Sequence, residues 1–251
     1  MIKSRLFLFS LHLASTHLGQ GGFVYGLILG YNRAMKSIFS LEFPKLNQVV
    51  LIIIFADFMI TTAAGLVIPV MALFFVEDIP GATASTVGFA IALYWIIKSI
   101  LQIPIARWLD RNYGEMDDYY AMLLGIFIVT VGAFLYYFAR EVWHIYALQV
   151  LIAVGDSFAT PPFYAIFTRH IDKNNEGFEW ALRSSFSFGM GSAIGGVLSA
   201  ILVGVIGVRS LFLVNGFLML LGFIIMLFLK PYILPKVQSV GQGIIMEQKR
   251  L

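Results

Sequence analysis

Long apolar runs, separated by short polar segments, dominate the pattern of this chain. Six runs contain at most one charged side chain each, and all have the length of about 20 residues that a helix needs to cross a bilayer. They are residues 46–76, 79–106, 119–139, 145–168, 184–208 and 210–229. Strands of a membrane β-barrel would instead alternate apolar and polar residues in segments of about ten. The pattern predicts an all-α, polytopic membrane protein with six transmembrane helices.

Composition excludes several other classes of protein. The chain is 59% hydrophobic and only 12% charged, with mean hydropathy +0.86, whereas soluble domains are about 25% charged. A soluble globular enzyme is therefore excluded. The chain has no cysteine, so disulfides, thiolate nucleophiles and cysteine-ligated metals are excluded as well.

Known catalytic and ligand-binding motifs are missing from the sequence. It contains no P-loop, nucleophile elbow or His-Glu-x-x-His pattern, and its 4 histidines are scattered beside the spans. We therefore expect no enzyme activity, no cofactor and no metal site. The basic residues lie mostly between the apolar runs and do not form one cluster. This distribution indicates that the partner is a lipid bilayer and not nucleic acid.

The basic residues also predict orientation. If the chain before residue 46 is cytoplasmic, nearly all of the 17 Lys and Arg residues fall on that side. Only Arg140 and Arg209 fall on the far side, and Lys98 lies inside a span. Because cytoplasmic loops carry an excess of Lys and Arg, we expect a multi-pass protein of the cell membrane with both termini cytoplasmic.

Residues 1–45 form a separate, poorly specified leader before the membrane domain at 46–231 and a cytoplasmic tail at 232–251. Residues 6–32 carry no charge, but histidine, glutamine and glycine dilute their apolar character. A seventh span and a signal peptide are two interpretations, although no small-residue cleavage site precedes a soluble domain. The interpretation that we favour is a leader that contributes little, with Met35 as the natural start.

A short segment between the second and third spans carries the most specific motif. Ala106 is followed after three residues by Asp110-Arg111 and then by Gly114. This loop resembles the signature loop of the major facilitator superfamily. Ala106 stands where that family usually has glycine, and Gly114 lies one position later than usual. An Asp-Arg pair in a loop is ordinarily a solvated ion pair, but its place between these two spans makes it specific.

Further segments agree with this resemblance. The fourth run contains Gly155 followed by Pro161-Pro162, and residues 207–212 resemble the family's turn into helix six. Over about residues 46–231 the resemblance implies one six-helix half of the fold, built from two inverted three-helix repeats. Such a half pairs with another around a cavity lined by helices one and four. Leu151 stands where many proton-coupled members have arginine, so proton antiport by the usual residues is not expected.

Three ionisable side chains lie inside the predicted spans, where an isolated charge is costly. Asp57 and Lys98 fall at similar depths on consecutive helices, and we expect them to pair, either as a structural lock or at the border of a translocation cavity. Asp156 has no evident partner and lies near mid-membrane on a helix expected to line the cavity. We expect substrate or ion binding at these residues, with Gln149 and Tyr94 beside them.

Glycines cluster in the fifth run. Gly189, Gly191 and Gly195 imitate a dinucleotide-binding fingerprint, but the last spacing is one residue too long and no strand precedes it. Small residues let membrane helices approach closely. We therefore interpret Gly191, Gly195 and Gly196 as helix-packing positions.

These observations lead to one functional hypothesis and one alternative. The first is a secondary transporter of a small solute that works by alternating access, as a half-size unit that dimerises or pairs with another half. A coupling proton or cation is expected to accompany the solute. The alternative is a non-transporting membrane assembly or sensor protein that retains the fold.

Overall fold

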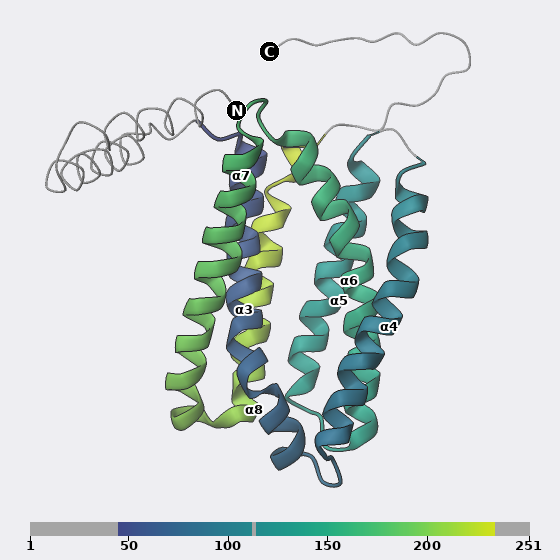
Figure 1. Cartoon of the computed structure of the whole chain (residues 1–251), viewed down its shortest axis with the longest axis vertical. Helices are drawn as coiled ribbons and strands as arrows, with labels where there is room; N and C mark the ends of the chain where they lie inside the picture. Colours follow the sequence, from purple (N-terminus) through teal and green to yellow (C-terminus); the bar gives the residue numbers. More distant parts are fainter. Residues whose placement is uncertain (1–44, 112–113, 234–251) are drawn as a thin grey trace, which may run out of the picture. The chain divides into compact units, whose positions relative to one another are not determined.

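Every regular element in the described part of the chain is helical. The computed structural model describes residues 45–111 and 114–233 (Figure 1). Its elements are α3 (Gln48–Asp78), α4 (Ala84–Leu109), α5 (Met116–Tyr136), α6 (Val142–His170), α7 (Glu176–Leu182), the π-helix η1 (Arg183–Met190), α8 (Gly191–Leu227) and the short 3-10 helix η2 (Lys230–Tyr232). The all-α prediction is confirmed. The leader, its start at Met35, a seventh span and the tail beyond residue 233 lie outside the described residues.

Five segments of this described part are long and apolar enough to cross a membrane. Four of them are α3 to α6, and the fifth is the continuous stretch Glu176–Tyr232, of 57 residues. At about 1.5 Å per residue, a straight helix of that length would far exceed a hydrocarbon core of about 30 Å. Gly207 interrupts the stretch with φ 77° and ψ 160°, a conformation that glycine adopts readily. The chain reverses direction in this part of α8 (Figure 1).

Polar residues at the helix starts explain where the spans begin. Asn47 precedes α3 and accepts a hydrogen bond from the Val49 amide at 2.9 Å. Thr83 and Thr86 form a capping box at the start of α4. These caps satisfy amide groups that have no partner within the helix. The helices α3 and α4 therefore begin close to the edges of their apolar runs.

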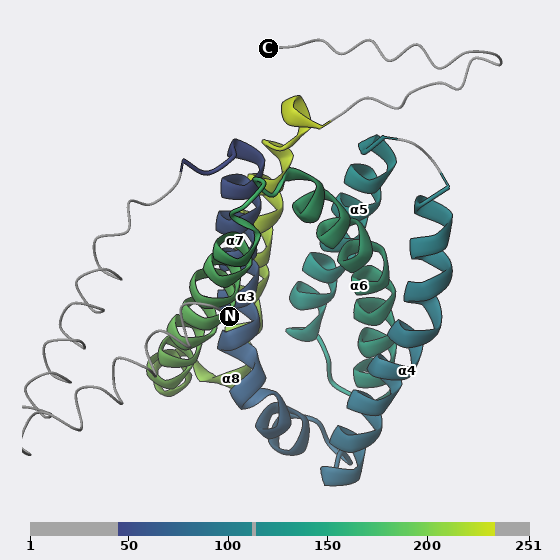
Figure 2. The same ribbon diagram turned by 45° about the horizontal axis from the view of Figure 1, so that its top comes forward.

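The helices pack in a pattern that does not follow their order in the chain. Along its length α3 packs against α8, while α4 packs against α6, and α5 lies between α6 and α8. α3 and α4 are joined by a short loop but separate from each other beyond it (Figure 2). The end of the bundle where α3 begins is called the Gln48 end below, and the end where α8 turns is called the Gly207 end.

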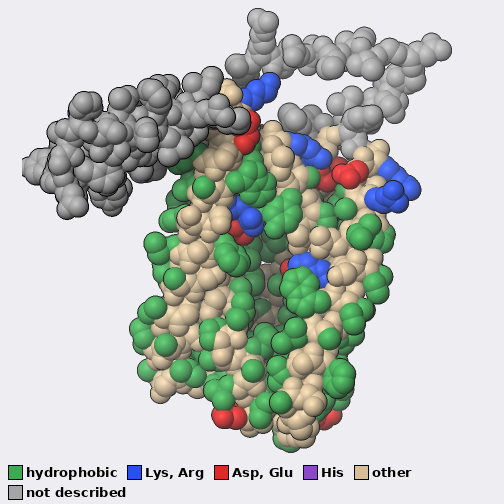
Figure 3. Space-filling view, viewed as in Figure 1, with side chains coloured by type: hydrophobic (Ala, Val, Ile, Leu, Met, Phe, Trp, Pro, Cys, Tyr) green, Lys and Arg blue, Asp and Glu red, His purple; other side chains and the backbone are tan. Residues whose placement is uncertain are grey.

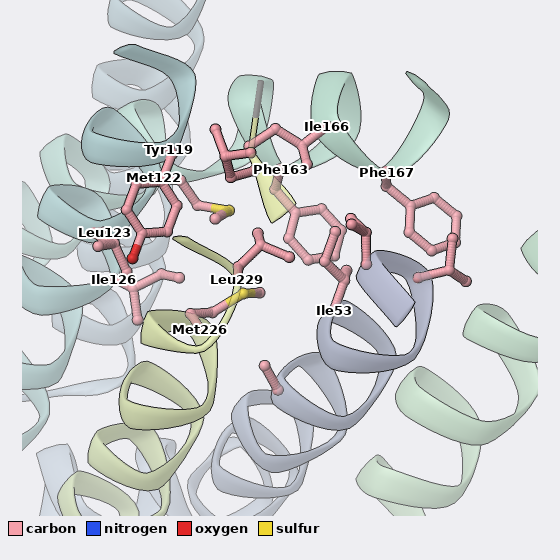
Figure 4. Packing of buried hydrophobic residues seen from close by; sticks show 14 of the residues in the cluster. Ile53, Tyr119, Met122, Leu123, Ile126, Phe163, Ile166, Phe167, Met226 and Leu229 are labelled. Atoms are coloured by element: carbon pink, nitrogen blue, oxygen red, sulfur yellow. The ribbon is translucent and has the colours of Figure 1, made fainter. Parts of the chain in front are cut away.

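Each end of the bundle has its own apolar cluster. At the Gln48 end, Ile53 from α3 packs with side chains of α5, α6 and the end of α8 (Figure 4). At the Gly207 end, the rings of Phe74, Tyr136 and Phe212 pack together. Arg209 lies over the ring of Phe74 and donates to the carbonyl oxygen of Asp78 at 3.1 Å. These contacts hold the two ends and leave the charged middle of the bundle between them.

Two of the three glycines that sequence analysis assigned to packing meet α3. A Cβ on Gly195 would lie 2.7 Å from the amide nitrogen of Leu66, and one on Gly191 would collide with the hydroxyl of Thr61. Gly196 does not share this contact, because a Cβ there would meet no atom within 4 Å. Successive residues of a helix point about 100° apart, so Gly196 is turned away from α3.

This difference between neighbours gives a test of the packing. Gly195→Ala should lower the free energy of unfolding by about 1–3 kcal/mol, because the backbone of α3 cannot move aside without opening the interface. Gly196→Ala is the matched control, and should leave stability unchanged or raise it slightly, since alanine favours helix. Thermal unfolding of both variants in detergent measures the effect. Equal transition temperatures would contradict the assigned contact.

Candidate functional site

A pocket of about 130 Å³ lies between α3, α5, α6 and η1, near the middle of the bundle. Its walls are mainly apolar, with three charged side chains among them. The lining residues are Asp57, Ile60, Ile126, Val129, Asp156, Ala159, Thr160, Phe163, Tyr164 and Arg183. The face seen in Figure 3 is hollowed between its helices, and basic and acidic side chains appear there well away from both ends.

The first ion pair joins α3 to η1. Arg183 Nε lies 3.1 Å from Asp57 Oδ2, and both side chains are largely buried. The guanidinium also lies over the rings of Phe163 and Tyr164, at 4.8 and 5.2 Å from their centroids. Ring faces attract cations, so the rings and the carboxylate together fix the position of the arginine.

The π-helix that carries Arg183 is held to α3 by side-chain hydrogen bonds. Ser187 donates through Oγ to the carbonyl oxygen of Ile54 at 2.9 Å, and Thr61 donates through Oγ1 to the carbonyl oxygen of Ser187. A π-helix is wider than an α-helix and is frequent at functional sites. These bonds stabilise the wider turn beside the pocket.

The second ion pair joins α4 to α6. Asp156 stands at the midpoint of α6, and its Oδ2 lies 3.4 Å from Lys98 Nζ. The hydroxyl of Tyr94 donates to the same oxygen, and Lys98 donates to that hydroxyl at 3.1 Å. Lys98 Nζ also lies 5.5 Å from the ring centroid of Trp95. Asp156 therefore has two partners on α4, although its sequence suggested none.

The predicted pairing of Asp57 with Lys98 is wrong. Each of the two residues pairs with another helix instead: Asp57 with Arg183, and Lys98 with Asp156. The physical reason is that equal depth on neighbouring spans says nothing about the direction in which a side chain points. Because α3 packs on α8 and α4 packs on α6, the two residues belong to different helix contacts.

The other predicted binding residues divide into two groups. Tyr94 contacts Asp156 and so belongs to the site. Gln149 is buried on α6, does not line the pocket, and lies two helical turns from Asp156 toward the Gly207 end. The structure therefore brings together Asp57, Asp156, Lys98 and Tyr94 around the middle of the bundle, and leaves Gln149 apart from them.

The signature-loop residues lie where α4 ends. Ala106 is still helical, Asp110 is the C-cap of α4 and donates its amide to the carbonyl oxygen of Ala106 at 2.9 Å, and Arg111 follows it. Gly114 has φ 115°, in the region that favours glycine. The backbone conformation at position 114, one residue later than the usual glycine of the family's loop, therefore favours glycine.

An ionic cluster joins α5 to α6 close to that loop. Arg169 pairs with Asp118 and lies 3.7 Å from Glu115, while His170 lies 2.9 Å from Glu115. Both acids are almost completely buried. The acidic residues after the signature loop are therefore partners for the basic end of α6. No group of three or more potential metal ligands occurs in the described ranges.

Sequence analysis missed Arg183 as a site residue. Its apolar run begins at residue 184, so Arg183 was placed in a cytoplasmic loop, but the helix begins earlier, at Glu176. Glu176 and Glu179 in the first turn are a helix-start signal that precedes the apolar run. That signal would have placed Arg183 inside the helix and made it a candidate partner for Asp57.

The assigned ion pairs can be checked by double-mutant cycles on the free energy of unfolding. Asp57→Asn with Arg183→Gln, and Lys98→Met with Asp156→Asn, should each show a coupling energy of about 1–3 kcal/mol, because the residues of a pair are in contact. The cycle of Asp57→Asn with Lys98→Met is the control. These two share no partner within the described residues, so their effects should add to within about 0.5 kcal/mol. Coupling in the control cycle alone would contradict the assignment.

Two curated proteins are similar in sequence to part of this chain. The chain is 28% identical over 130 residues to an uncharacterized MFS-type transporter of Methanocaldococcus jannaschii, a match that covers 52% of this chain and 32% of the relative. It is 22% identical over 145 residues to the class C tetracycline resistance protein of Escherichia coli, covering 58% and 35%. The chain thus spans about a third of the length of these curated relatives.

A solved structure shares the fold. The crystal structure of the POT family transporter PepTSo superposes with a TM-score of 0.58 at 16% sequence identity, over 80% of this chain and 40% of that chain. In addition, the family model for the Major Facilitator Superfamily matches residues 52–245, which is most of the sequence. The resemblance noted at the signature loop is thereby confirmed, and the chain belongs to the Major Facilitator Superfamily.

Proposed function

We propose that this chain is a secondary transporter of a small solute that works by alternating access. Its family and its transporter relatives support a role in membrane transport. The observation that carries the proposal is the pocket between Asp57, Asp156 and Arg183 near the middle of the bundle. Ionisable groups at this depth are costly unless they serve a cavity or a partner, and here they surround a space that a solute can occupy.

The proposed topology has six membrane crossings in two inverted three-helix repeats. α3, α4 and α5 make the first repeat. α6 makes the second repeat together with the two parts of the stretch Glu176–Tyr232 on either side of Gly207. The basic side chains Arg107, Arg169 and Lys230 stand at the Gln48 end. The excess of positive charge on cytoplasmic loops supports placing this end, and both termini, in the cytoplasm of a cell-membrane protein.

The proposed assembly is a parallel homodimer. The face seen in Figure 3 is hollowed, and the helices α4 and α8 carry exposed apolar side chains, including Ile96 and Ile100 on α4 and Val197 and Ile201 on α8. A second six-helix unit, supplied by another copy of the chain, would cover this face. It would enclose a path between two copies of Asp156, where a coupling proton or cation would bind with the solute.

Asp156→Asn tests the transport role. Purified protein is first screened by thermal shift for a solute that stabilises it, and uptake of that solute into proteoliposomes is then measured. We expect Asp156→Asn to reduce uptake at least tenfold, because the variant removes the most exposed charge of the pocket. The mass of the protein in mild detergent should remain that of a dimer in both wild type and variant.

Asp172→Asn serves as the matched control, since it makes the same chemical change outside the pocket, between α6 and α7. It should leave uptake and mass unchanged. A monomer that transports would refute the dimer, and uptake that survives Asp156→Asn would refute the role of this site. Protein that is folded and dimeric but takes up no solute from the screen would favour an assembly or sensor protein.

A further inference from the structure

The two ion pairs leave unused hydrogen-bonding groups at the pocket. Both contacts of Asp156 use Oδ2, so no described residue donates to its Oδ1. Its side chain is 28% exposed, against 14% for Lys98 and 9% for Asp57, so it is the carboxylate most open to a ligand. Oδ1 of Asp156 is therefore available for an ammonium or amine group.

Arg183 offers the opposite chemistry. Its Nε faces Asp57, and its guanidinium lies over aromatic rings. Its terminal nitrogens, Nη1 and Nη2, donate to no acceptor among the residues that the structure describes. Guanidinium groups favour planar oxyanions such as carboxylates. Arg183 is therefore available for an acidic group of a ligand.

The charge balance of the site restricts the ligand further. Asp57, Arg183, Lys98 and Asp156 contribute two negative and two positive charges, so the four side chains are neutral together. A ligand with net charge would leave an unbalanced charge in an environment of low dielectric, which is unfavourable. A zwitterion adds both charges at once and avoids this cost.

The walls between the two ends of the pocket are apolar. Ile60, Ile126 and Val129 line one part, and the rings of Phe163 and Tyr164 line another. These surfaces suit a hydrocarbon or aromatic body that carries the two charged groups. The pocket volume, about 130 Å³, suits a molecule of amino-acid size.

We propose that the pocket binds small zwitterions with an apolar or aromatic body, the amine at Asp156 Oδ1 and the acidic group at Arg183. This proposal deepens the proposed transport function, and it rests on that function for the identity of the zwitterion as the transported solute. Such a ligand would link α6 to η1. It would thereby connect the α4–α6 contact with the α3–η1 contact, which the two ion pairs hold separately.

Two matched series of probes test the proposal by calorimetric titration of the full chain in detergent. The zwitterions are para-aminomethylbenzoate, with its charges at opposite ends of a ring, and phenylalanine, with its charges on one carbon. Benzylamine and benzoate are the singly charged analogues of the first, and phenethylamine and hydrocinnamate are those of the second. We expect at least one zwitterion to bind about tenfold more tightly than either of its analogues, because each analogue leaves one end of the site unpaired.

Two variants locate the ends of the ligand. Asp156→Asn should weaken binding of the zwitterion and the amine but not of the acid. Arg183→Lys keeps the charge beside Asp57 but removes the forked donors, and should weaken binding of the zwitterion and the acid but not of the amine. Asp172→Asn is the control that leaves all affinities unchanged, and thermal unfolding confirms that each variant is folded.

The outcomes separate this proposal from the transport function. Analogues that bind as tightly as the zwitterions, zwitterions that do not bind, or variants that weaken all probes equally would overturn the zwitterion site. Uptake that depends on Asp156 without any binding of zwitterions would also overturn it, while leaving transport intact. Binding in the expected pattern without uptake would support the site and refute transport.

Discussion

Charge neutralisation inside an apolar bundle is the constraint on which this structure depends. An ionised side chain in the hydrocarbon region costs several kcal/mol unless a partner or water compensates it. The described bundle meets this requirement twice, with Asp57 paired to Arg183 and Asp156 paired to Lys98. Each pair joins two helices that are not consecutive in the chain, so compensation of charge and packing of helices are satisfied by the same contacts. The pocket lies where these two contacts face each other.

Close packing around the pairs keeps this arrangement in place. Small residues such as Gly195 bring α8 against the backbone of α3, and the hydroxyls of Thr61 and Ser187 hold the π-helix η1 beside them. Apolar clusters close both ends of the bundle, at Ile53 and at Phe74. The helices are therefore closely packed at both ends, and the polar groups in the middle retain unused hydrogen-bonding capacity. That combination suits a site that receives a solute and holds it between helices.

The sequence alone predicted the all-α fold and three charged residues of the site. The predictions that failed did so for physical reasons. Apolar runs identified the membrane-spanning segments, because burial in lipid requires about 20 apolar residues whatever the neighbours are. Asp57, Lys98 and Asp156 were identified as candidate functional residues because charged side chains are rare within such apolar segments. Their partners were not predictable, because depth along a helix does not give the direction of a side chain around it. Arg183 was missed because the polar first turns of its helix precede the apolar run. Gly196 was grouped with Gly195 because the spacing of glycines does not reveal which of two neighbours faces α3.

Access to the pocket from the two sides of the membrane tests the central claim most directly. The chain has no cysteine, so a single cysteine at Thr160, which lines the pocket, reports on its exposure to a membrane-impermeant maleimide. Thr130, which is 3% exposed and lies outside the pocket, is the matched control. The account predicts that Thr160→Cys is labelled in both right-side-out and inside-out vesicles, whereas Thr130→Cys is labelled in neither. Labelling of Thr160→Cys from one side only, or from neither side, would contradict it.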